Sequence, residues 1–251
     1  MANGCVSIDR ILSKLDEYLH RNDYVSAERH LTYWLAEANG AGDMRTELLV
    51  RNELMGLYRK LSREVEAVGC AEAALSLIET RGIGDQVGSA TTYLNAATVY
   101  KAFGRAADGL PWFERAKVIY ERELPPNDGR LGGLYNNMGL ALVDLGRYKD
   151  ADESYQKAIS VMKQTEEGLL EVAITYLNMA SAAEAEQGLE DAAETIEALL
   201  DKAEELLEHH QKRDGYYAFV CEKCASVFGY YGRFSYATEL KARAGRIYEG
   251  N

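Results

Sequence analysis

The sequence predicts an all-α protein built as a solenoid of about six antiparallel helix pairs, and three observations support this. A segment beginning at Tyr93 recurs at Tyr135 and, more loosely, at Tyr176, which defines a repeat of about 42 residues. Ala, Leu, Glu and Lys recur at helical spacing, and the chain has only three prolines. Six residues suited to turns recur 40 to 44 positions apart: Asn22, Ser62, Gly104, Gly146, Gly188 and Gly232. Repeats of this length bury their core between neighbouring units, so the helix pairs are expected to stack.

Each repeat is expected to form one helix pair, and residues 1–251 are expected to form a single domain. In the fourth repeat, apolar residues at helical spacing run from Leu134 to Leu145, and Gly146 can adopt the left-handed conformation that ends a helix. From Tyr148 to Met162 a second apolar stripe follows. Small residues are expected where the two helices of each pair cross: Ala27, Ala67, Gly109, Ala151, Ala192 and Ala237. The predicted units are 7–40, 46–82, 89–124, 131–164, 171–210 and 215–249.

Composition narrows the classes of partner. The 251 residues include 40 acidic and 28 basic side chains, for a net charge of -12. Such a charge repels phosphate backbones and anionic lipids, so neither nucleic acid nor a membrane is an expected partner. No apolar stretch is long enough to span a bilayer, and the N-terminus lacks a signal-peptide pattern, so a soluble cytoplasmic protein is expected. Four cysteines in a chain of this length favour reduced thiols over disulfides.

The fourth repeat carries a family signature. Its aromatic and small residues resemble the tetratricopeptide repeat at Tyr135, Gly139, Leu142, Gly146, Tyr148, Ala151, Tyr155 and Ala158. The repeat length is similar to that of the kinesin-light-chain-like variant. This resemblance implies a right-handed superhelical solenoid whose first helices line a concave groove for a protein or peptide segment. It implies no cofactor.

The resemblance also implies which residues face that groove. Asn95, Asn137 and Asn178 each lie two residues after an opening Tyr, and Asn52 lies near the matching place in the second repeat. They resemble an asparagine ladder whose amides hold a ligand backbone. The alternative is that these amides bond the neighbouring helix. Further groove residues are expected one turn away: Arg59, Thr91, Thr98, Lys101, Asn136, Leu140, Asp144, Ser181, Glu184 and Lys223.

Two biased segments lie near the C-terminus. Residues 184–208 contain ten acidic side chains and one basic one, Lys202, which indicates either a site for a basic partner or a solvated helix face. Eight aromatic residues occupy 216–236, and the adjacent pairs Tyr216–Tyr217 and Tyr230–Tyr231 cannot all point inward. Some are therefore expected at the surface, at the edge of the groove or in a self-association patch.

Catalytic and metal-binding motifs are weak by comparison. His209, His210, Cys221 and Cys224 resemble a zinc ligand set in type, but the repeat places both cysteines at core positions and the histidines at a solvated helix end. No phosphate loop, serine elbow or paired-carboxylate motif occurs, so the chain is not expected to be an enzyme. The sequence thus favours an interaction scaffold. The alternatives are a peptide-responsive regulator and a self-associating structural protein.

Overall fold

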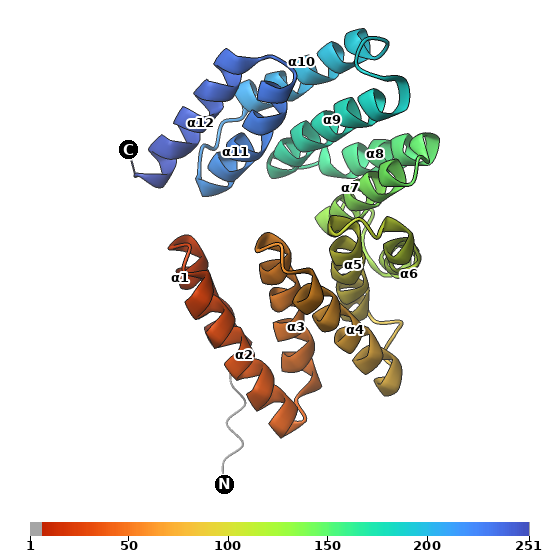
Figure 1. Ribbon diagram of the computed structural model, residues 1–251, viewed down its shortest axis with the longest axis vertical. Coiled ribbons are helices and arrows are strands. Elements are labelled where there is room, and N and C mark those ends of the chain that lie inside the picture. Colours follow the sequence, from red (N-terminus) through yellow and green to blue (C-terminus); the bar gives the residue numbers. More distant parts are fainter. Residues whose placement is uncertain (1–6, 251) are drawn as a thin grey trace. The chain divides into compact units, whose positions relative to one another are not determined.

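The protein is all-α, as the sequence predicts. The computed structural model describes residues 7–250, except the side chains of residues 166 and 167, and this part contains twelve helices and no strand (Figure 1). The helices are α1 (Ile8–His20), α2 (Tyr24–Ala41), α3 (Met44–Lys60), α4 (Glu64–Arg81), α5 (Val87–Ala102), α6 (Ala106–Glu123), α7 (Gly129–Asp144), α8 (Tyr148–Met162), α9 (Glu166–Gln187), α10 (Ala193–His209), α11 (Gly215–Tyr230) and α12 (Phe234–Tyr248). None of them is both long and apolar enough to cross a membrane.

Contacts within the chain define two compact units. Unit 1 comprises the described residues up to Tyr120, and unit 2 comprises those from Glu121 onward, so the boundary lies in the last turn of α6. Within unit 1 the first helix α3 packs against α5, and within unit 2 α9 packs against both α7 and α11. This stacking of first helices builds the solenoid inside each unit. The single domain that the sequence predicts stays a prediction.

The six predicted turn residues all join the two helices of a pair with positive φ. The four glycines have φ between 69° and 85°, whereas Asn22 and Ser62 have φ of 54° and 56°. This backbone region suits glycine and is strained for residues with a Cβ. The regular spacing of these residues therefore has a direct conformational cause.

Helix starts are set by capping side chains that satisfy exposed backbone N–H groups. The carboxylates of Asp23, Asp43, Asp128 and Asp214 accept hydrogen bonds from the first turns of α2, α3, α7 and α11, and the Thr165 hydroxyl does so for α9. The caps of α3, α7, α9 and α11 lie at the starts of helix pairs, whereas Asp23 lies between the two helices of the first pair.

The six small residues expected at helix crossings are all buried. Gly109 shows why the side chain must be small: a Cβ at this position would lie 2.8 Å from the carbonyl oxygen of Ala97. At Gly139, a Cβ would lie 2.5 Å from the ring of Tyr155. Backbone proximity thus outweighs the weaker helix propensity of glycine.

Candidate peptide-binding surface

In unit 1, the predicted asparagines hold neighbouring first helices together. Asn95 of α5 donates from Nδ2 to Oδ1 of Asn52 in α3, at 2.9 Å. Asn52 in turn donates from Nδ2 to the Thr92 hydroxyl at 3.0 Å and to the Leu48 carbonyl at 2.9 Å. Asn52, Thr92 and Asn95 therefore form a side-chain link between α3 and α5, which we call the amide clamp of unit 1.

The same clamp occurs two repeats later in unit 2. Asn178 of α9 donates from Nδ2 to Oδ1 of Asn136 in α7 at 3.1 Å, and the Thr175 hydroxyl donates to the same oxygen at 3.2 Å. Asn136 is buried and holds the place that Asn52 holds in unit 1. Thr92 and Thr175 were not expected at the site. Their signal in the sequence is that each immediately precedes an opening tyrosine, Tyr93 or Tyr176.

The clamps leave part of each amide unused. Asn95 and Asn178 are half-buried, and their Oδ1 atoms accept no hydrogen bond from the residues that the structure describes. Asn137 donates only to the Gly133 carbonyl of its own helix, at 2.8 Å, and its Oδ1 is likewise unbonded within residues 7–250. Each amide group also has a second N–H. All three asparagines therefore retain an acceptor and a donor.

The other predicted groove residues differ in their exposure and in whether their polar atoms are already hydrogen-bonded. Thr98 and Ser181 donate to the carbonyls of Leu94 and Leu177 in their own helices, and Thr91 bonds the Tyr120 hydroxyl at 2.7 Å. Glu184 is engaged on both oxygens by Tyr230 and Tyr231, each at 2.7 Å. Lys101 and Leu140 are half-buried near the middle or end of their helices, and Arg59 is exposed at the end of α3. Lys223 is exposed, with its ammonium 5.7 Å from the centre of the Phe219 ring.

Two glutamates on these helices have raised pKa values and were not singled out from the sequence. Glu53 follows Asn52 in α3 and precedes Asn95 by one repeat. Burial, followed by the negative charge of Asp16, raises the pKa of Glu53. In unit 2, burial raises the pKa of Glu171, and the nearby Lys223 partly opposes this. The signal that could have found Glu53 is its repeat register with Asn95.

We call the positions in this register the ladder positions. They are Glu53 and Asn95 in unit 1, and Asn137, Asn178 and Lys223 in unit 2. Unit 1 therefore presents an acid beside its asparagine, with Asp16 adding to the negative charge. Unit 2 presents a lysine beside its two asparagines.

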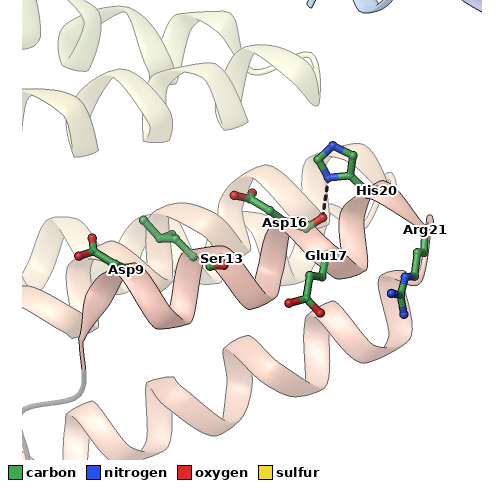
Figure 2. A pocket seen from close by; sticks show the side chains of 7 residues that line it. Asp9, Ser13, Asp16, Glu17, His20 and Arg21 are labelled. Atoms are coloured by element: carbon green, nitrogen blue, oxygen red, sulfur yellow. Dashed lines mark hydrogen bonds between the residues drawn. The ribbon is translucent and has the colours of Figure 1, made fainter. Parts of the chain in front are cut away.

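Helix α1 carries an open, polar pocket. Its volume is about 580 Å³, and Figure 2 shows side chains of Asp9, Ser13, Asp16 and Glu17 along this helix. The imidazole of His20 bonds the Asp16 carbonyl at 2.8 Å through Nδ1. Three carboxylates therefore line this pocket together with Arg21, and Lys14 pairs with Glu17.

The cysteine and histidine residues are placed mainly by packing. Cys221 and Cys224 are buried in the core of unit 2, as predicted, and burial raises the pKa of the Cys224 thiol to about 12. His209 is exposed, but the prediction of a solvated end is wrong for His210, which is 5% exposed and stacks on Tyr217. Between residues 7 and 250, no three His, Cys, Asp or Glu side chains gather as a metal ligand set. Cys5 lies outside the described residues.

The C-terminal aromatic residues divide between core and surface, as predicted. Tyr217 and Phe228 are fully buried, whereas Tyr216, Phe219 and Tyr230 are 40%, 47% and 68% exposed. Tyr216 and Phe219 stack on one another at 6.3 Å between ring centres. The last helix pair therefore presents aromatic surface beside Lys223.

Comparison with known proteins identifies a family for part of the chain. Residues 88–164, which cover α5 to α8, match the tetratricopeptide repeat family. Residues 88–164 contain tetratricopeptide repeats. This confirms the resemblance of the fourth repeat, and proteins with tetratricopeptide repeats are generally non-catalytic scaffolds for protein–protein interaction. No curated protein has a significantly similar sequence.

Several solved structures have a similar tetratricopeptide-like fold. BtubC (BKLC) from P. vanneervenii superposes with a TM-score of 0.68 and 19% identity, covering 82% of both chains. The TPR-like repeats of a kinesin light chain from Podosopora anserina give 0.55 and 16%, covering 80% of this chain and 94% of that one. Rap protein complexed with Competence and Sporulation Factor gives 0.53 and 13%, covering 94% and 73%. These likenesses establish the solenoid of helix pairs.

Proposed function

We propose that this protein is a non-catalytic cytoplasmic adaptor that binds segments of a partner protein on the ladder positions of its first helices. The observation that carries the proposal is the unused hydrogen-bonding capacity of Asn95, Asn137 and Asn178 beside the clamps. An amide can pair with any peptide group, because it both donates and accepts. A row of such amides would therefore hold a backbone with little selection for side chains.

Charged residues beside the asparagines would select among the side chains of the partner segment. In unit 1, Glu53 and Asp16 favour a basic residue of the partner, since burial, followed by the negative charge of Asp16, raises the pKa of Glu53 and a bound cation would oppose both effects. In unit 2, the exposed Lys223 favours an acidic residue, and Phe219 and Tyr216 beside it offer apolar surface. The two units would thus prefer segments of opposite charge.

The most direct test uses Asn137, because its amide bonds only its own helix and links no two helices. We expect Asn137→Ala to lose partners that wild-type protein captures from native lysate, with an unchanged circular dichroism spectrum. Gln164→Ala is the matched control, since Gln164 also donates to a carbonyl of its own chain and is exposed. An identical set of captured partners for wild type and Asn137→Ala would contradict the ladder assignment.

Asn95 and Asn178 need a different control because they also belong to the clamps. Replacing either by Ala removes a link between helices, so thermal stability must be measured beside capture. Small-angle X-ray scattering of the captured complex separates an adaptor from a peptide-responsive regulator, since a regulator compacts when its ligand binds.

The exposed aromatic residues of α11 favour self-association as a second candidate function. Tyr216, Phe219 and Tyr230 form apolar surface on the last helix pair. Light scattering over a dilution series tests this, with Phe219→Ser as the variant. A constant monomer mass over the series would exclude it.

A further inference from the structure

A second cavity lies in unit 2, and none of the ladder positions lines it. Its volume is about 190 Å³, and helices α8, α9 and α10 contribute its walls. Apolar side chains form one part of the lining: Met179, Ala182, Ala183 and Leu199. Polar side chains form the rest: Tyr148, Asp152, Glu186, Gln187 and Thr195. We call this cavity the α8–α10 groove.

Tyr155 also lines the groove and carries an unsatisfied polar atom. Its side chain is completely buried, and its hydroxyl has no hydrogen-bond partner in the described part of the chain. Two other fully buried tyrosines have a hydrogen-bonded hydroxyl: that of Tyr120 bonds Thr91 at 2.7 Å, and that of Tyr217 bonds the Leu207 carbonyl at 3.3 Å. A buried hydroxyl without a partner costs stability, and a hydrogen-bonding group brought by a ligand would remove that cost.

The hydroxyl is a neutral hydrogen-bonding group in this setting. Burial, followed by the negative charge of Asp144, raises the pKa of Tyr155 above its ordinary value. The phenol therefore stays protonated, and its oxygen retains the ability to accept a hydrogen bond.

Carboxylates without cationic partners surround the groove. Asp152 receives only the neutral side-chain amide of Gln156 at 3.3 Å, and Glu186 has no side-chain bond to any residue between 7 and 250. The exposed Glu190, Asp191 and Glu194 follow in the turn before α10 and in its first turn, and they too have no ion pair with described residues.

The acids further along α10 are ion-paired, with the exception of the exposed Glu205. Arg233 pairs with Glu197, Asp201 and Glu204, and Arg243 pairs with Glu208. The unneutralised charge of the acidic segment is therefore concentrated at the end of α10 that borders the groove.

We propose that the α8–α10 groove receives a lysine or arginine side chain from a basic segment of a partner protein. The methylene groups of such a side chain would lie along Met179 and Leu199, as long cationic side chains do on apolar surfaces. Its cationic head would lie between Asp152 and Glu186 and donate a hydrogen bond to the Tyr155 oxygen. The unpaired carboxylates disfavour an anionic occupant.

The test measures binding of a short, capped peptide of alternating lysine and alanine by calorimetry at low ionic strength. We expect Asp152→Asn/Glu186→Gln to weaken binding by at least about fivefold. The matched control is Glu153→Gln/Glu205→Gln, which makes the same charge change on α8 and α10 at exposed residues outside the groove. Its affinity should fall clearly less than that of Asp152→Asn/Glu186→Gln, because neither Glu153 nor Glu205 lines the groove where the cationic head would be held. Equal losses in both variants, or no binding by wild type, would overturn the proposal.

Tyr155→Phe tests insertion into the groove. This variant should be more stable than wild type, because it removes an unsatisfied buried group, yet it should bind the lysine peptide several-fold more weakly. A peptide with norleucine in place of lysine should bind neither protein. If Tyr155→Phe keeps full affinity, or if the norleucine peptide binds as well as the lysine peptide, the cationic side chain does not occupy the cavity and the proposal is wrong.

Discussion

Units 1 and 2 share the amide clamp but differ in the charge beside it. Asn52 with Asn95, and Asn136 with Asn178, form the same link between neighbouring first helices. The ladder positions next to these clamps carry Glu53 in unit 1 and Lys223 in unit 2. The comparison teaches that residues which link neighbouring first helices are repeated, whereas Glu53 and Lys223, which make no such link, differ in charge between the units.

The units also differ in how they use arginine. Arg243 of unit 2 is 8% exposed and bonds Glu208, Glu239 and Tyr217. Arg63 of unit 1 pairs with Glu28 and Glu66, but its side chain is 37% exposed. Breaking an ion pair lowers stability most when it leaves a buried polar group without a partner. Replacing Arg243 should therefore lower the free energy of unfolding more than replacing Arg63.

The largest effect is expected for Arg243→Met. It should lower the free energy of unfolding by about 2 to 3 kcal/mol, because the buried guanidinium joins Glu208, Glu239 and the Tyr217 hydroxyl, and its removal breaks all of these bonds at once. Arg63→Met should cost less than about 1 kcal/mol. Urea denaturation followed by circular dichroism measures both. Similar costs for the two variants would remove this difference between the units.

The Arg243 pair also has a pH signature. The hydrogen bond from Arg243 lowers the pKa of Glu208, so its contribution is present above the ordinary glutamate pKa and is lost as the pH falls through the lowered value. The stability gap between wild type and Arg243→Met should therefore narrow below about pH 4. A gap that is constant down to pH 2 would assign the loss to packing instead.

The next largest effect is expected at the close helix crossings. Gly109→Ala in unit 1 should destabilise by about 2 kcal/mol, because its Cβ would meet the Ala97 carbonyl. Gly139→Ala in unit 2 should behave alike, against the Tyr155 ring. Gly56→Ala is the control, since nothing lies within 4 Å of its Cβ, and it should gain about 0.5 to 1 kcal/mol from helix propensity. A gain for Gly109→Ala would mean that the crossing can widen.

A smaller effect is expected at the turns, where unit 1 has Asn22 and Ser62 and unit 2 has only glycines. Ser62→Gly should stabilise by about 0.5 kcal/mol, because it relieves a positive φ at some cost in chain entropy. The reciprocal Gly146→Ser should cost about 1 kcal/mol. Thermal melts of both variants measure this. If both variants raised, or both lowered, the melting temperature, a contact other than the backbone conformation would determine the stability of these turns.

The smallest effect is expected for the ladder glutamates. A carboxyl with a raised pKa stabilises the fold only at low pH, and this contribution is lost as the pH rises through its pKa. Glu53→Gln should therefore raise the melting temperature at pH 7 but not at pH 4. Glu171→Gln should gain less, because Lys223 offsets the burial of Glu171 whereas Asp16 repels Glu53. Equal gains would mean that burial alone sets both pKa values.

Much of the fold was predictable because its signals are local. Left-handed turn residues such as Ser62 and Gly146, and buried small residues such as Ala151, lie where the repeat pattern places them. The site was less predictable. Asn136, not Asn137, completes the clamp of unit 2, and a shift of one residue turns a side chain by about 100° around a helix. His210 was expected in solvent but packs on Tyr217.

The sequence by itself determined the period, the helix pairs and the residues at their turns and crossings, because these depend on contacts within a few residues along the chain. Only the tertiary structure decided which amide faces a neighbouring helix, which glutamate is buried beside a like charge, and which tyrosine lacks a partner. Those outcomes depend on how adjacent helices are rotated against one another. Asn52 and Thr92, for example, are 40 residues apart in the sequence and are hydrogen-bonded in the structure. No pattern of neighbouring residues predicts such a contact.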